Sequence, residues 1–430
     1  MATLLENIRV DYELNKPLYD EMQDYYDGKS YALKNYTECE LRSNRKINCN
    51  YTQKFVNEEA SYVIGNPVTY TSNTNNVQEI KDINSAFKSW SLKHNKELVK
   101  QSLIFNQAYE LYFTDKRGDF ASIICTPQDS YALLDDNGYI EVFVRFYHKK
   151  FDTTEYADVF TDENITHYTV LGGLFEQIGV PEQNIFSRIP VSIVNIGTVY
   201  ESLFCNIKSL QDAYSIILSD ICNEISDNRN AYLILRACDL IDEDITKMQE
   251  MGILQLPNDK AGAEYLIKNL NDSFIQNTLK TLQENIYMLA NHINYNQSLS
   301  SNTSSLALKN QLIGLINKCT NNIQAIQDCF KTRIEFLFEY LAKTKGTSYD
   351  WKDIECLITP NIPSDDMLIA QILSQYPEFS VKTGLSQFSF IKDVDNEMKQ
   401  KEIEAKALSI GADLLNNSNN NTIPVNGGAA

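Results

Sequence analysis

The stretch SSLALKNQLIGLINKCTNNIQAIQDCFKTRIEFLFEYLAK covers residues 304–343 and contains no proline. Serine is a common helix cap, and apolar residues recur through the stretch at helical spacing, so the pattern predicts one unbroken helix. At a rise of about 1.5 Å per residue, about 40 residues give a helix of about 60 Å. That length exceeds the diameter of a small domain, so the helix must serve more than one layer of an elongated subunit.

Two further helices and a polar segment precede this stretch. Residues 294–303 are polar and carry no charged side chain. A helix is predicted over 272–293, with Asp272 or Ser273 as its cap, and another over about 200–235. The insert between these helices, 237–271, predicts an acidic helix and two short strands. The helix over 200–235 carries one apolar stripe, made of Leu210, Ala213, Tyr214, Ile217, Ile221 and Ile225.

The N-terminal half of the chain mixes helices with strands. Helices are predicted up to Gly65-Asn66-Pro67, which is a strong helix breaker. From about residue 107 to 197 the apolar period changes to two, which predicts strands, among them a hairpin over 108–125. Residues 351–357 predict a strand that returns to this region. The fold class is therefore α+β, mostly helical, with a disordered end after about residue 410.

The charge of the chain limits how it can treat nucleic acid. The formal net charge is −19 at pH 7 and the isoelectric point is near 4.7. Proteins that grip DNA need clustered Lys and Arg to neutralise phosphates. An acidic chain of this kind is expected to guide DNA past its surface rather than to hold it.

The residues that carry catalysis and metal binding form no motif. The nine cysteines are scattered without a C-x-x-C pair and indicate reduced thiols in a cytosolic protein. The four histidines are isolated, and neither a phosphate-binding G-x-x-x-x-G-K-[ST] loop nor a G-x-S-x-G elbow occurs. We therefore expect no enzyme, no metal and no cofactor. The start of the chain lacks the pattern of a signal peptide, and no apolar run approaches about 20 residues, so we expect no membrane partner.

Five short segments, in this order, resemble the portal (head-to-tail connector) proteins of long-tailed bacteriophages that infect Gram-positive hosts. Gln107 and Ser305 stand where that family usually has small residues. The segments are Asn50–Asn57 with Gly65-Asn66-Pro67-Val68-Thr69-Tyr70, Gln107-Ala108-Tyr109-Glu110-Leu111, Ser209–Tyr214 with 218–220 and 231–235, Ser304–Lys309 with Leu315, and Ile362-Pro363 with 368–373. The resemblance spans residues 10 to about 405.

The resemblance implies a virion protein that is assembled in the host cytoplasm. Such proteins form a closed ring, typically a dodecamer, at one capsid vertex, and double-stranded DNA passes through it without sequence-specific binding. The terminase large subunit docks during packaging, a head-completion (adaptor) protein follows, and the major capsid or scaffolding protein surrounds the ring. The implied regions are wing 1–202, stem helix 203–236, clip 237–271, second stem helix 272–293, tunnel loop 294–303, long wing helix 304–345, returning wing strand 346–361, crown 362–410 and tail 411–430.

Four groups of candidate site residues follow from this assignment. Tyr295 and Leu299 of the tunnel loop either contact DNA or pack on a neighbouring loop, and each candidate lysine is either channel-facing or an ordinary surface residue. The loop candidates are Tyr295, Asn296, Gln297, Ser298, Leu299, Ser300, Ser301 and Asn302, and the lysines are Lys280, Lys309 and Lys318. Ring and stem packing is expected from Leu210, Tyr214, Ile217, Ile221, Ile225, Leu282 and Ile286. Docking of partners to the clip is expected from Asp242, Glu243, Asp244 and Glu250, which otherwise cap and solubilise a helix.

The rival interpretation is a non-conducting structural scaffold, or a tail or capsid interaction protein, built from long helices. A portal needs a central loop beside a long helix and an interface that closes a ring. A scaffold needs neither, and it would tolerate scrambling of residues 294–303.

Overall fold

The chain divides into two compact units, residues 1–361 and 362–430. The computed structural model describes residues 2–36, 43–227, 232–236, 261–266, 271–294, 305–361, 375, 380–385, 388, 394 and 397–406. Within the second unit these include the short helix α11 (Val381–Leu385) and the helical residues 397–406. Across the described ranges, no helix combines the length and the apolar character that crossing a membrane requires.

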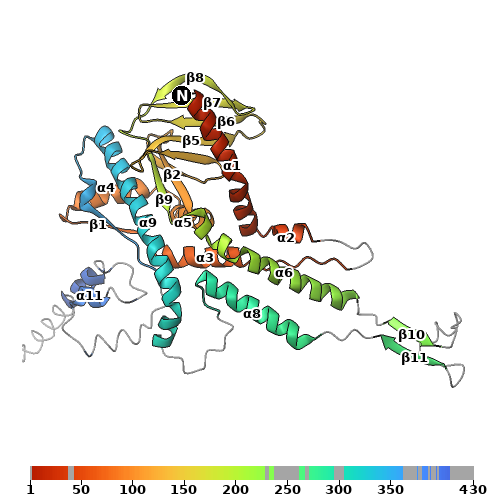
Figure 1. Cartoon of the computed structure of the whole chain (residues 1–430). Helices are drawn as coiled ribbons and strands as arrows, with labels where there is room; N and C mark the ends of the chain where they lie inside the picture. The colour runs from red at the N-terminus through yellow and green to blue at the C-terminus, as the bar shows by residue number, and fades with distance from the viewer. Residues whose placement is uncertain are drawn as a thin grey trace, which may run out of the picture. The chain divides into compact units, whose positions relative to one another are not determined.

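The long helix predicted from the sequence is α9 (Ser305–Lys345), with 41 residues. From Leu315 onward it buries one side in the main hydrophobic core of the first unit (Figure 1). The fully buried apolar side chains include Cys319, Ile326, Phe330 and Leu337, whose spacing matches one face of a helix. The prediction of a single unbroken helix is confirmed.

Two antiparallel sheets occupy the region of period two. The strands β2 (Gln107–Thr114), β3 (Phe120–Cys125) and β9 (Val191–Asn195) form one sheet in the order β3-β2-β9. The other sheet is a meander of β4 (Ser130–Leu134), β5 (Ile140–His148), β6 (Glu155–Phe160), β7 (Asn164–Leu171) and β8 (Leu174–Gln183). The helix α1 (Ala2–Tyr26) covers one face of this meander, because Leu5, Ile8 and Tyr12 share a core with Val142, Val144 and Val159.

The first unit contains eight further short elements, of which α3, η2 and β12 contact α9. They are α2 (Tyr31–Lys34), α3 (Tyr51–Val63), β1 (Thr69–Ser72), α4 (Val77–Phe87), α5 (His94–Phe105), η1 (Val199–Glu201), η2 (Trp351–Asp353) and β12 (Ile354–Leu357). Strand β12 pairs antiparallel with β1, so the chain after α9 does return to the N-terminal region as predicted. Gly65 lies in the turn between α3 and β1, where a Cβ atom would meet the carbonyl oxygen of Ser61 at 2.4 Å.

The helices α6 (Leu203–Asp227) and α8 (Asp272–Ala290) lie side by side (Figure 1). The predicted stem helix over 203–236 is wrong at its end, because α6 stops at Asp227 and residues 232–236 form the strand β10. β10 (Tyr232–Arg236) pairs antiparallel with β11 (Gly262–Leu266), and its aromatic and branched side chains favour a strand. The cap of α8 is Asn271, whose side chain accepts the amide of Phe274, and not Asp272 or Ser273.

Candidate functional site at the junction of α3, α8 and α9

The end of α8 turns the chain sharply inward. Asn291 adopts left-handed backbone angles, with φ of 58°, a conformation that asparagine tolerates better than most residues. Its amide donates to the carbonyl of Met288 at 3.2 Å, and the amide of His292 donates to the carbonyl of Tyr287 at 3.0 Å. This is the bond pattern of a Schellman motif. The motif directs the ring of His292 onto Phe55 of α3, with ring centroids 4.2 Å apart.

Two carboxylates from α3 face the two nitrogens of this imidazole. Nδ1 of His292 lies 3.0 Å from Glu58, and Nε2 lies 2.9 Å from Glu59. The side chains of His292 and Glu59 are each 1% exposed. The imidazole is therefore held between two carboxylates, one of them fully buried.

Lys318 brings α9 into the same cluster. Its ammonium group donates to Oε1 of Glu59 and, at 3.3 Å, to the carbonyl of Ala290 at the end of α8. Asn322 donates to the other oxygen of Glu59 at 3.4 Å. Burial raises the pKa of Glu59, but Lys318 and His292 outweigh it, so that its net pKa lies below the ordinary value. Glu59 is therefore an ionised carboxylate that contacts His292, just after α8, and Lys318 and Asn322 of α9.

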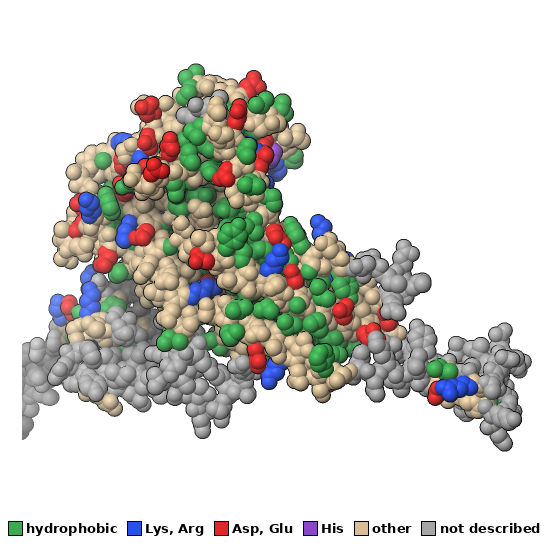
Figure 2. Space-filling view, in the orientation of Figure 1, with side chains coloured by type: hydrophobic (Ala, Val, Ile, Leu, Met, Phe, Trp, Pro, Cys, Tyr) green, Lys and Arg blue, Asp and Glu red, His purple; other side chains and the backbone are tan. Residues whose placement is uncertain are grey.

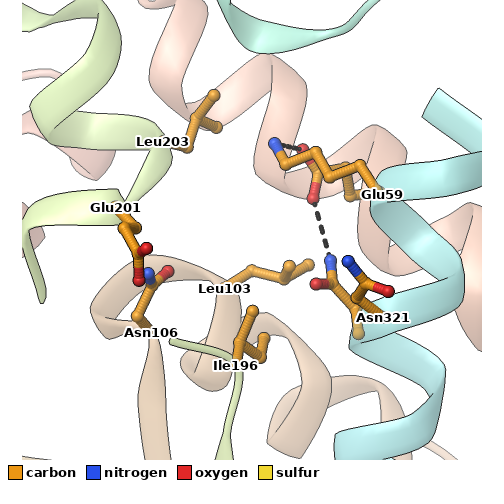
Figure 3. Close-up of a pocket in the computed structure, with 9 residues that line it drawn as sticks. Glu59, Leu103, Asn106, Ile196, Glu201, Leu203 and Asn321 are labelled. Carbon is orange, nitrogen blue, oxygen red and sulfur yellow. Dashed lines mark hydrogen bonds and ion pairs between the residues drawn. The ribbon is translucent and has the colours of Figure 1, made fainter. Parts of the chain in front are cut away.

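A cavity of about 210 Å³ opens beside this cluster. Glu59 and Asn321 line one wall, and Asn106 and Glu201 line the opposite wall (Figure 3). Lys318 also lines the cavity. Glu201 is engaged locally, because its carboxylate accepts the amide and hydroxyl of Thr198 at 2.8 and 2.9 Å. No trio of His, Cys, Asp or Glu side chains is grouped as metal ligands within the described part of the chain. The cavity thus offers separate polar groups rather than a metal site.

The lysines chosen from the sequence differ in their surroundings. Lys318 is engaged within the subunit, because its ammonium group donates to Glu59 and to the carbonyl of Ala290. The rotation of α9 about its axis, which periodicity does not determine, places it there. Lys280 is exposed on α8. The side chain of Lys309, the loop residues Tyr295–Asn302 and the acidic residues Asp242, Glu243, Asp244 and Glu250 lie outside the described part of the structure.

The stem-packing candidates differ in how far they are buried within one subunit. Leu210 and Tyr214 pack against the main core, Ile286 is fully buried, and Leu282 is half-buried. Tyr51 of α3 lies between the rings of Tyr214 and Tyr287, at 5.7 and 5.9 Å. Toward the other end of α6, Ile217 and Ile221 are half-buried and Ile225 is 58% exposed, so packing of these three between subunits stays a prediction.

From Gln211 onward the buried face of α6 is polar, and the segment 43–50 covers it. The buried residues Gln211, Ser215, Ser219 and Asn223 follow one another every four positions. Backbone amides donate to these side chains, including Cys49 to Ser215 at 3.2 Å, Ile47 to Ser219 at 2.9 Å and Arg45 to Asn223 at 2.7 Å. Four helical residues advance about 6.0 Å and two extended residues about 6.6 Å. The two repeats therefore match, and every second amide finds an acceptor.

The polar face of α6 and the charged junction each have a sequence signal that hydrophobic periodicity does not detect. A polar side chain at every fourth position, from Gln211 to Asn223, marks a helix face that accepts backbone amides. Glu58-Glu59 inside the apolar pattern of α3 marks a buried charge that needs a cation. Neither signal names its partner, because His292 and Lys318 are more than 200 residues away in the sequence.

Comparisons with known proteins agree with this architecture. The family of phage portal proteins described as SPP1 Gp6-like matches residues 5–409. The portal protein of Bacillus phage SPP1 is 22% identical over 428 residues, which cover 93% of this chain and 83% of that protein.

Solved structures similar to the chain include two from gene transfer agent particles. A chain in the neck of an empty particle has a TM-score of 0.49 and 10% identity, covering 80% of this chain and 88% of that one. A chain in the virion of a native particle has a TM-score of 0.45 and 12% identity, covering 77% and 87%. Since the family match extends over nearly the whole sequence, the chain belongs to the phage portal protein family, SPP1 Gp6-like.

Proposed function

We propose that copies of this chain close into a ring at one capsid vertex, with a dodecamer as the expected size, and that double-stranded DNA passes through the ring during packaging and ejection. The observation that carries the proposal is the apolar surface left open on the helix pair α6–α8. Ile225, Phe274 and Met288 are 58%, 69% and 64% exposed there. On the face drawn in Figure 2, hydrophobic side chains lie along this pair among charged ones.

A second copy of the chain is the occupant that this surface fits. The polar face of α6 is already covered by residues 43–50, so the pair has its apolar flanks left to offer. In a ring, each subunit presents one flank to the next, and the contacts close without leaving an unpaired surface. Each Å² of apolar surface buried between neighbouring subunits would stabilise the ring by about 25 cal/mol.

The hairpin β10–β11 supports the same assembly. It pairs five residues on each strand, and an isolated two-stranded hairpin is marginally stable in water. Its unpaired strand edges can gain partners from neighbouring subunits. We assign this hairpin and the residues between its strands to the clip, where the terminase large subunit and later a head-completion protein would dock.

We assign the DNA-facing role to residues 294–303, which carry no charge. Together with the net charge of −19, this composition supports a channel that guides DNA without holding it. The role is structural, in the virion, and needs no cofactor. The wing would then meet the major capsid or scaffolding protein.

Negative-stain microscopy of the purified protein, with its mass measured in parallel, tests the ring. We expect rings with a central hole wide enough for a DNA duplex. Ile225→Asp should prevent ring formation, because it buries an unpaired charge between subunits, whereas Ser209→Asp adds the same charge at an exposed position of α6 and serves as the control. Rings of Ile225→Asp indistinguishable from those of the control would refute the interface.

Deleting residues 295–302 tests the channel. Rings should still form, but packaged DNA that resists nuclease should be lost. Normal packaging and retention of DNA in this variant would favour the scaffold interpretation instead.

A further inference from the structure

We propose that Glu59, His292 and Lys318 are positioning residues for DNA passage, because they fix the two points from which residues 295–304 depart. This inference rests on the proposed function of the ring and of that segment. None of the three side chains needs to touch DNA. They act by holding the end of α8 and the first buried part of α9 to one carboxylate on α3.

The contacts that close this junction lie on both sides of the segment. His292 follows α8 directly and is held by Glu58 and Glu59. On α9, Leu315 is buried and Lys318 is bonded to Glu59 and to the last carbonyl of α8. A cation at this carbonyl also suits the negative end of the helix dipole.

The two helices are in contact at the junction. A Cβ atom added to Gly314 of α9 would lie 3.5 Å from the side-chain oxygen of Asn291 and 3.8 Å from its Cβ, which is ordinary van der Waals contact. α9 therefore passes close beside the turn that ends α8. The position of each helix is therefore tied to the other, both by this close approach and by Glu59.

Charged contacts, rather than apolar packing, fix the relative position of α8 and α9 at this junction. The ammonium of Lys318 and both ring nitrogens of His292 face the carboxylates Glu58 and Glu59. Apolar contacts tolerate sliding, whereas a buried carboxylate with fixed donors accepts only one arrangement. Changing Glu59 should consequently alter where the segment starts and ends without removing the helices themselves.

The substitution Glu59→Gln removes the charge and keeps the size of the side chain. We expect rings to assemble, and nuclease-protected DNA in procapsids that carry the variant to fall by roughly tenfold. Glu201→Gln is the matched control, because Glu201 lines the same cavity but bonds only within its own turn. Packaging by Glu59→Gln equal to that by Glu201→Gln overturns the proposal.

An engineered disulfide can hold the two helices together in place of the charged contacts. Its effect shows whether Glu59 acts by positioning the helices or only by stabilising the fold. The 3.8 Å between the Cβ positions at 291 and 314 equals the mean spacing of a disulfide, about 3.8 Å. Adding Asn291→Cys and Gly314→Cys to Glu59→Gln should restore packaging after oxidation of the procapsids, and a reducing agent should abolish the rescue. Failure of the oxidised, mass-verified disulfide to restore packaging overturns the proposal.

Two further experiments decide the cases that the substitution and the disulfide leave open. If Glu59→Gln does not assemble, the oxidised cysteine pair is tested with Glu59 intact: normal packaging supports a fixed junction, and lost packaging overturns it. Deletion of 295–302 in the same assay separates the two levels of inference. Normal packaging by the deletion variant refutes the proposed role of the segment, whereas its failure together with normal packaging by Glu59→Gln refutes only the positioning role.

Discussion

The substitution Arg333→Met would isolate a buried charge in the core between α9 and β2. Glu110 of β2 is fully buried, and Nε of Arg333 donates to its Oε2 at 2.9 Å. The same carboxylate accepts Tyr112 at 2.8 Å and faces His94 at 2.6 Å. Methionine keeps much of the length of the arginine side chain but removes its charge, so Glu110 would retain its neutral donors and lose its main cation.

The expected cost follows from this burial. Removing one partner of a buried ion pair costs about 3–5 kcal/mol, because the remaining charge is uncompensated. His94 stays beside Glu110 and can supply part of the compensation, so we expect the lower end, about 3 kcal/mol. That energy changes the ratio of folded to unfolded protein by roughly two orders of magnitude. Lys331→Met on the same helix breaks an exposed pair with Asp328 and should cost less than about 1 kcal/mol.

Unfolding in urea, followed by tryptophan fluorescence, measures this difference. Trp90 is one of two tryptophans in the chain, and the guanidinium of Arg333 lies 5.3 Å from its ring, so the signal reports on the cluster. The double variant Glu110→Gln with Arg333→Met should recover part of the loss, since no buried charge remains unpaired. Equal costs for Arg333→Met and Lys331→Met, or a double variant worse than the sum of its parts, would refute the reasoning.

Three other predictions follow from separate contacts. Ser219→Ala removes the acceptor of the Ile47 amide, so it should cost about 1–3 kcal/mol and speed hydrogen exchange in the peptide covering 43–50, and unchanged protection would contradict the role of α6. Gly65→Ala should cost about 1–3 kcal/mol through its clash at 2.4 Å, while Gly262→Ala, with nothing within 4 Å, should leave the urea midpoint nearly unchanged. Burial raises the pKa of Glu110, but Arg333 and His94 outweigh it and lower the pKa to about 2 from 4.5. The free energy of unfolding should therefore fall as the pH drops from 4.5 to about 2, and Glu110→Gln should flatten that decline.

Periodicity was sufficient for the elements whose burial is apolar. The helix over 304–343, the hairpin over 108–125 and the strand over 351–357 correspond to α9, to β2–β3 and to β12 with the preceding turn. These segments bury alternating or helically spaced apolar residues, and that burial is the main force that fixes them. Their types could therefore be predicted from the sequence without knowledge of their partners.

Periodicity failed where polar groups are buried. The apolar stripe from Leu210 to Ile225 does not reveal the buried polar face from Gln211 to Asn223, because serine and asparagine accept backbone amides there and need no apolar neighbour. The pattern predicts residues 232–235 as the end of a helix, whereas they belong to the strand β10, since five residues fit either period and only pairing with β11 decides. The charged junction of Glu59 was not predicted, because Lys and Glu are seldom buried and their partners lie far away in sequence.

The two buried charge clusters share one helix, and their positions explain what they add beyond stability. Lys318 and Arg333 are 15 residues apart on α9, which is about 22 Å along the axis. Apolar contacts along the stripe between them would allow α9 to shift or rotate at small cost, because such contacts are not directional. Each cation instead meets a single buried carboxylate, Glu59 on α3 or Glu110 on β2, and either shift or rotation would separate both carboxylates from their cations on α9. We infer that the clusters fix the register of α9 against the wing, so that its start beside α8 is set by the sheet at its other end.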